Sequence, residues 1–246
     1  MLKQENSFLP FSTSECPRGP WLIFAPHADD ETYGMGGAIL KAKSIGLKTH
    51  LVVMTDGALG GEASNLIDVR RQEVEAAAQE LGISTIDCWA EQDRSLKIKS
   101  SLVTRIVDKI LLAEPAAIFF PSPLEPHPDH RVTTLLVWSA LQMLPPCKRP
   151  DAYSYEISVQ SPINMLLDIT GQAAQKEAVM RIYASQNSQN NYEDLVKALD
   201  KARTFSLSSI VEHAEGFYHY SDEQLQKSLK LTLSKIIDQY TLQSSI

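Results

Sequence analysis

Histidine and aspartate residues gather at two places in the sequence, each directly after an apolar run. At the first place, the run at 21–25 leads to His27, and Asp-Asp-Glu follows at 29–31. His27 and Asp30 are three residues apart in the turn that leaves the run, so an imidazole nitrogen and a carboxylate oxygen can converge on one ion. Zinc accepts both kinds of ligand. The spacing therefore predicts part of a zinc site.

The third ligand is expected from the second place, where residues 126–131 read Pro-His-Pro-Asp-His-Arg after the apolar run at 116–120. In open α/β sheets, ligands bind at the carboxyl ends of the strands, and neighbouring parallel strands would bring the two clusters together. Three protein ligands and a water make an open, catalytic zinc site. Taken singly, the acidic stretch is typical of a helix N-terminus and the His-Pro-Asp stretch of a turn. Only their conjunction favours a metal site.

The paired motifs resemble those of the zinc-dependent N-deacetylases of the PIG-L/LmbE family. The resemblance rests on His-Ala-Asp-Asp-Glu at 27–31 with glycines at 34, 36 and 37, and on His-Pro-Asp-His at 127–130. It extends over about residues 21–131, and Tyr-Ala-Ser-Gln at 183–186 also fits the family. It implies a hydrolase that removes the acetyl group from the amide nitrogen of an N-acetylglucosamine-type sugar. The expected cofactor is Zn²⁺, and the expected partner is a small N-acetylated sugar or sugar conjugate.

The motif residues receive separate roles in such a reaction. Three ligands hold the zinc: His27, Asp30 and His130. Asp29 is the spare carboxylate, and as general base it takes a proton from the attacking water and returns it to the departing amine. The resemblance further implies that His127 faces the developing oxyanion and that Asp129 hydrogen-bonds one imidazole and sets its tautomer. If that imidazole belongs to His127, the hydrogen bond favours its protonated form.

Two positions depart from the family pattern. Ala28 stands where the family usually has proline, which frees one φ angle but removes no ligand. Glu125 stands where some relatives carry tyrosine, and a carboxylate there would change what the substrate meets.

An arginine is the expected substrate-binding residue. Arg70 and Glu73 are three residues apart on the helix expected at 66–81, so they share a face and can form an ordinary solvent-exposed ion pair. The Arg-x-x-Glu pattern also resembles the place where the family brings an arginine to the sugar. It follows a loop with three glycines at 56–61, which either approaches the substrate or is only a connector.

The remaining elements must bring these residues to one edge of a sheet. Buried apolar runs alternate along the chain with segments of helical periodicity, which predicts a Rossmann-like parallel sheet of about five strands, flanked by helices. The expected strand order, 3-2-1-4-5, puts the first and fourth strands side by side. Strands are expected at 21–25, 48–55, 84–90, 116–120 and 151–159, and helices at 34–45, 66–81, 102–112 and 132–144. Residues 161–246 are expected to be mainly helical, with helices at 172–183, 192–204 and 224–240.

Composition narrows the class of protein. One domain is expected over residues 1–246, with 1–19 as an N-terminal arm. A formal net charge of −7 offers no basic surface for nucleic acid. No apolar stretch has the length of a signal-peptide core or a membrane span, so a cytoplasmic protein without a transmembrane segment is expected. Three cysteines in no metal-binding pattern fit a reducing compartment. Homo-oligomers occur in the family, so the resemblance allows one here.

Two other classes of function remain open. A metal-dependent hydrolase of phosphoesters would suit the same residue types, but many such enzymes use two ions about 4 Å apart. A sugar-binding module without catalysis would need the ligands and have no use for Asp29. His213 and His219 are interpreted as ordinary surface or interior histidines. The sequence leaves open which N-acetylated substrate the site would accept.

Overall fold

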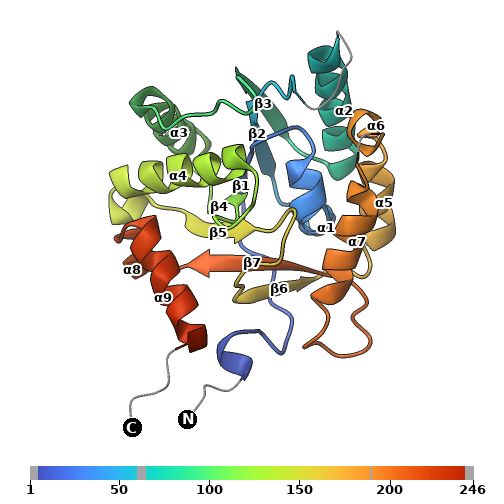
Figure 1. The fold of residues 1–246 in the computed structure, drawn as a ribbon, viewed down its shortest axis with the longest axis vertical. Coiled ribbons are helices and arrows are strands. Elements are labelled where there is room, and N and C mark those ends of the chain that lie inside the picture. Colours follow the sequence, from blue (N-terminus) through green and yellow to red (C-terminus); the bar gives the residue numbers. More distant parts are fainter. Residues whose placement is uncertain (1–4, 60–64, 189, 242–246) are drawn as a thin grey trace.

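The computed structural model, which describes residues 5–59, 65–188 and 190–241, contains a central sheet of seven strands in the order β3-β2-β1-β4-β5-β7-β6 (Figure 1). The first five of these in the order pair in parallel, which confirms the predicted order 3-2-1-4-5. The strands are β1 (Trp21–Ala25), β2 (Thr49–Thr55), β3 (Thr85–Glu91), β4 (Ala117–Pro121), β5 (Asp151–Tyr155), β6 (Met165–Asp168) and β7 (Ala214–Tyr220).

Helices cover both faces of this sheet (Figure 1). One face packs against α1 (Asp30–Ser44), α2 (Leu66–Leu81), α5 (Ala173–Met180) and α7 (Tyr192–Ala202), with α6 (Ala184–Asn187) beside α2. The other face packs against α3 (Ser100–Ala113), α4 (Pro128–Met143), α8 (Asp222–Leu225) and α9 (Leu229–Thr241). Two 3₁₀ turns lie at Glu5–Ser7 and Pro146–Lys148.

Strand β1 shows why the apolar runs do not alternate with polar residues. Trp21, Ile23 and Ala25 belong to the core under α1, whereas Leu22 and Phe24 belong to the core under α4. All five side chains are buried, as expected for a parallel strand with helices on both faces.

The C-terminal part is mainly helical, as predicted, and it also adds two strands that we did not expect. β7 pairs antiparallel with β5, and β6 pairs antiparallel with β7. β6 has only four residues, and β7 carries Glu215, Gly216 and His219, so neither has the apolar pattern that marks β1 or β4. These two segments become strands because their side chains pack on the sheet and because β7 pairs with β5. The local sequence does not encode such long-range contacts.

Helices α1 and α4 each begin four residues earlier than predicted, and both differences concern the motifs. α1 begins at Asp30 and α4 at Pro128, whereas the periodicity placed these starts at 34 and 132. The motif aspartate and histidine therefore stand in the first turns of helices that leave β1 and β4. Gly34 allows α1 to lie against β5, because a Cβ atom there would come within 2.5 Å of the carbonyl oxygen of Glu156.

Candidate active site

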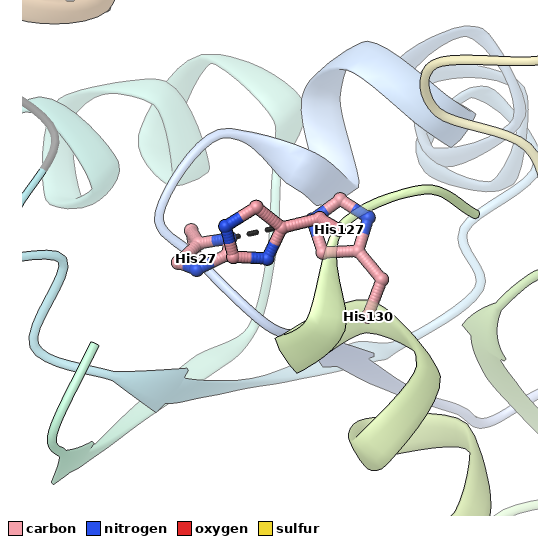
Figure 2. A group of neighbouring side chains, drawn as sticks. All are labelled: His27, His127 and His130. Atoms are coloured by element: carbon pink, nitrogen blue, oxygen red, sulfur yellow. Dashed lines mark hydrogen bonds between the residues drawn. The ribbon is translucent and has the colours of Figure 1, made fainter. Parts of the chain in front are cut away.

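The two motifs meet where β1 and β4 end. These strands are direct neighbours, with Trp21 opposite Ala117, so both turns open on the same sheet edge. Figure 2 shows the imidazoles of His27, His127 and His130 directed toward one another from these turns.

Three atoms with lone pairs form a nearly equilateral triangle. Nδ1 of His27 lies 3.2 Å from Oδ2 of Asp30, and Nε2 of His130 lies 3.3 Å from the same oxygen. The two imidazole nitrogens are 3.3 Å apart (Figure 2). A tetrahedral zinc with bonds of about 2.0 to 2.1 Å separates its ligand atoms by about 3.3 Å. The three predicted ligands therefore fit one face of a tetrahedral metal site.

A second group of possible ligands surrounds the other nitrogen of His27. Its Nε2 lies 3.2 Å from Oδ1 of Asp93 and 3.3 Å from Oδ2 of Asp129, and His127 completes this group. Both carboxylates already accept backbone N–H groups, from Leu59 in one case and from Arg94 in the other. Because His27 belongs to both groups, it can hold a metal through Nδ1 while Nε2–H donates to a carboxylate, an arrangement common for metal-bound histidines.

The two adjacent aspartates, Asp29 and Asp30, differ in the direction of their pKa shifts. Burial by itself would raise the pKa of Asp30, but the His130 and His27 imidazoles lower it well below its usual range. Burial raises the pKa of Asp29 to about 8, and the charge of Asp30 adds to this effect while Arg70 opposes it. Only Asp30 belongs to the triangle, whereas the carboxylate of Asp29 lies 3.2 Å from the guanidinium of Arg70.

The backbone at Asp29 is strained. Its φ of 140° lies in a region that residues with a side chain rarely adopt and that costs of order 1 to 3 kcal/mol. Glu31, fully buried, accepts a hydrogen bond of 3.3 Å from the N–H of Asp29. Tyr183 donates to Glu31 over 2.5 Å from the far part of the chain. These contacts hold the turn in its unusual conformation.

Arg70 points into this turn and not into solvent. It is 4% exposed, and its guanidinium donates to the carbonyls of Ala28 (3.0 Å) and Gly57 (3.2 Å) and to Oδ2 of Asp29 (3.2 Å). Glu73, also buried, instead accepts from the N–H and hydroxyl of Ser185. The solvent-exposed Arg70–Glu73 pair considered from the sequence does not form.

His127 and Asp129 make different contacts from those expected of a mutual pair. The carboxylate of Asp129 lies beside His27, while its backbone N–H donates to Nδ1 of His127 over 3.2 Å at the start of α4. A neutral His127 therefore carries its proton on Nε2. Burial and the nearby His27 and His130 lower the pKa of His127 to about 4, so the protonated form is disfavoured in the metal-free protein.

A cavity of about 740 Å³ opens over these residues. All predicted site residues except Asp129 line it, together with Leu59 from the loop after β2 and Ser158, Asn190 and Tyr192 from the C-terminal part. Its size suits a small ligand such as a sugar conjugate. Gly60 and Gly61 of the glycine loop lie outside the described residues.

Sequence reasoning missed Asp93 and Tyr183 as contributors to the site. Asp93 lies between the strand expected at 84–90 and the helix expected at 102–112, yet it is 3% exposed and faces His27. Its position directly after the third parallel strand, at the same sheet edge, was the available signal. Tyr183 belongs to a stretch that already fitted the family, but its contact with Glu31 spans 152 positions and has no local signature.

Comparisons with known proteins agree with this geometry. A sequence model of the PIG-L family, described as GlcNAc-PI de-N-acetylase, matches residues 22–141. The chain is 30% identical over 144 residues to a probable N-acetyl-alpha-D-glucosaminyl L-malate deacetylase 2 of Bacillus anthracis, covering 54% of this chain and 64% of the relative. It is 33% identical over 118 residues to a diacetylchitobiose deacetylase of Thermococcus kodakarensis, covering 45% and 44% of the two chains. The matches thus span less than two thirds of either relative.

The fold agrees as well. The N,N'-diacetylchitobiose deacetylase from Pyrococcus horikoshii superposes with a TM-score of 0.71 at 26% identity, over 81% of this chain and 83% of that one. No helix among residues 5–59, 65–188 and 190–241 is both long and apolar enough to span a bilayer. The family match, the relatives and the fold together place residues 22–141 of the chain in the PIG-L/LmbE family.

Proposed function

We propose that the protein is a zinc-dependent N-deacetylase that removes the acetyl group from an N-acetylglucosamine-type sugar. The observation that carries the proposal is the triangle of His27, Asp30 and His130, with edges of 3.2 to 3.3 Å. The relatives add support, because they are named for deacetylation of an N-acetylglucosaminyl malate and of diacetylchitobiose. A cytoplasmic location and a homo-oligomeric state stay predictions.

Hydrolysis of an amide needs a nucleophile and a proton for the leaving nitrogen. When bound, zinc would polarise a water and lower its pKa toward about 7. Asp29 takes a proton from the attacking water while the oxygen of that water bonds to the acetyl carbon. Asp29 then gives this proton to the nitrogen as the C–N bond breaks, which leaves acetate and a free amine. Arg70, 3.2 Å from Asp29, favours the ionised carboxylate that this role requires.

His127 is suited to stabilise the oxyanion that develops on the acetyl oxygen. It lines the cavity, and its Nδ1 accepts the backbone N–H of Asp129, so Nε2–H is free to donate in the neutral form. Asp129 acts through His27 and does not contact the substrate itself. Its carboxylate lies beside Nε2 of His27 and fixes which nitrogen of that ring carries the proton.

Arg70 combines two roles in this proposal. Its contacts with Asp29 and Ala28 orient the base, and its place on the cavity wall allows a contact with the sugar. The first role supports catalysis and the second supports substrate binding, and kinetics can separate them.

The two alternative functions have less support. A phosphoesterase with two ions would need both groups of ligands as separate sites, yet both groups depend on His27. A module that only binds sugar would have no use for Asp29, which the fold holds in a strained conformation beside the ligands.

The test is acetate release from a panel of N-acetylated sugars, which includes N-acetylglucosaminyl malate and diacetylchitobiose. Zinc-loaded protein should release acetate from at least one of them, and a chelator should abolish the reaction. A phosphate monoester and a phosphate diester serve as controls. Phosphate release without acetate release, or acetate release that survives full removal of metal, would contradict the proposal.

A further inference from the structure

Glu125 departs from the family pattern, and its surroundings differ from those expected. Its side chain is 0% exposed and does not line the cavity, so the substrate does not meet it. Its carboxylate accepts the backbone N–H groups of Ile157 (2.8 Å, at Oε1) and Ser158 (3.1 Å, at both oxygens). Arg131 bonds the carbonyls of Glu125 and Pro126, not this carboxylate. Within the described part of the chain, no lysine or arginine pairs with it.

The other neighbour of this carboxylate is a metal-ligand histidine. Oε2 of Glu125 lies 3.6 Å from Nδ1 of His130, slightly beyond hydrogen-bond distance. Among the residues that the structure describes, Nδ1 of His130 has no hydrogen-bond partner although it is buried. The Nε2 of the same ring belongs to the triangle with Asp30 and His27. A small rotation of the ring would complete the bond from Nδ1–H to Glu125.

We propose that Glu125 is a positioning residue, which holds the proton of His130 on Nδ1 so that the lone pair of Nε2 faces the metal. An ionised carboxylate only accepts hydrogen bonds, so it favours the tautomer with the proton on its own side. Such partners orient metal-bound histidines, and their loss typically weakens metal binding 10- to 100-fold. This inference rests on the proposed zinc site and adds a residue that contacts neither metal nor substrate.

The same carboxylate also connects the ligand to the cavity wall. Ile157 and Ser158 line the cavity, and their backbone N–H groups are held by Glu125. One buried side chain therefore sets both the direction of a metal ligand and the position of a wall segment. The wall contact uses mainly Oε1, whereas the histidine faces Oε2, so one substitution can separate the two roles.

The separating substitution is Glu125→Gln. The glutamine oxygen can replace Oε1 and keep both wall hydrogen bonds, because the reverse orientation would place an NH₂ group against the N–H of Ile157. The NH₂ group then replaces Oε2 and faces Nδ1 of His130 as a donor. It favours the tautomer with the proton on Nε2, where the metal would bind. Zinc affinity should fall about 10- to 100-fold in competition with a chromogenic chelator.

Glu73→Gln is the matched control. Glu73 is also buried and accepts a backbone N–H, from Ser185 over 2.8 Å, but the structure gives it no contact with a histidine. Both variants lose a buried carboxylate, so a merely structural role predicts similar falls in the melting temperature of the metal-free proteins and no difference in zinc affinity. Positioning predicts that only E125Q loses zinc affinity, and that its stabilisation by added zinc is smaller than that of the parent.

Glu125→Asp covers the case in which E125Q does not fold. The shorter side chain keeps the charge and can still reach the wall, but its oxygens withdraw from His130, so zinc affinity should again fall. If a folded E125Q or E125D binds zinc within twofold of the parent, Glu125 has no positioning role. If the parent itself binds no zinc, the proposed function fails and this inference fails with it.

Discussion

Two clusters of buried charged residues can be compared in this protein, one at the sheet edge and one under α1. In the first, lone pairs of His27, Asp30 and His130 face one another 3.2 to 3.3 Å apart, and no lysine or arginine of the described chain lies among them. In the second, Nζ of Lys176 lies 2.7 Å from Asp200 and 2.8 Å from Glu215. The second cluster contains its own cation, whereas the proposed function assigns the first a metal ion from outside.

The two clusters also differ in how fully their polar atoms are hydrogen-bonded. Glu215 also accepts the N–H groups of Gly37 and Ala38, where α1 is broken at Met35. The Lys176 cluster is thus closed and joins α5, α7 and β7 to α1. The histidine cluster opens to the cavity, and no residue that the structure describes hydrogen-bonds Nδ1 of His130. Burial of charge alone therefore does not separate the two clusters, whereas the approach of two imidazole nitrogens and a carboxylate oxygen beside a cavity does.

The largest expected effect comes from Asp29→Asn, which removes the proposed base and leaves the triangle intact. Turnover should fall roughly 100- to 10,000-fold, the usual contribution of a general base, while zinc content stays that of the parent. Acetate release and elemental analysis on the same preparation measure both. If D29N loses zinc and keeps its activity, the roles of Asp29 and Asp30 are reversed.

His130→Ala comes next and should remove most of the bound zinc, because two ligands hold the ion poorly. Purified parent protein should carry about one zinc per chain. The other cluster supplies the control. Lys176→Met should lower stability by about 3 to 5 kcal/mol, since it leaves buried carboxylates without their cation, but zinc per folded chain should not change. Two zinc ions per parent chain, or full zinc in H130A, would overturn the one-ion site.

Arg70→Ala should have a smaller effect, and its kinetic form distinguishes the two roles. If orientation of Asp29 dominates, kcat falls with little change in KM; if contact with the sugar dominates, KM rises. The two contacts of Arg70 with the turn, at Ala28 and Asp29, favour the first result. Zinc content should stay constant. Unchanged kcat/KM for every accepted substrate would remove Arg70 from the site.

The two clusters also differ in what the sequence could reveal. The histidine cluster was predictable because His27 and Asp30, and likewise His127 and His130, stand within short motifs directly after apolar runs. The topology of parallel strands then brings the two motifs together. Asp93 follows a third strand of the same edge but has no motif around it, so it was missed.

The Lys176 cluster had no such signal. Its three members are single residues on α5, α7 and β7, and none of them stands in a short motif after an apolar run. The structure shows Lys176 at 1% and Glu215 at 2% exposure. Their burial depends on β6 and β7, the two strands that we did not predict. Where long-range packing decides secondary structure, it also decides which charges are buried.

The smallest expected effect is the dependence of stability on pH that arises from Asp200. Lys176 supplies one positive charge to two carboxylates, those of Asp200 and Glu215. Burial raises the pKa of Asp200 to about 7, with Lys176 opposing this and Glu215 adding to it. Between about pH 4 and pH 7 the unfolded chain has lost this proton and the folded chain retains it, so stability falls as pH rises.

Asp200→Asn should remove this contribution. The free energy of unfolding of the parent should fall relative to that of D200N by at most about 1.4 kcal/mol per pH unit up to about pH 7, and the difference should then level off. Urea unfolding at pH 5, 6, 7 and 8 measures it, and Asp108→Asn, at an exposed position of α3, is the control. Parallel curves for D200N and parent over this range would mean that Asp200 is already ionised in the folded protein at pH 5.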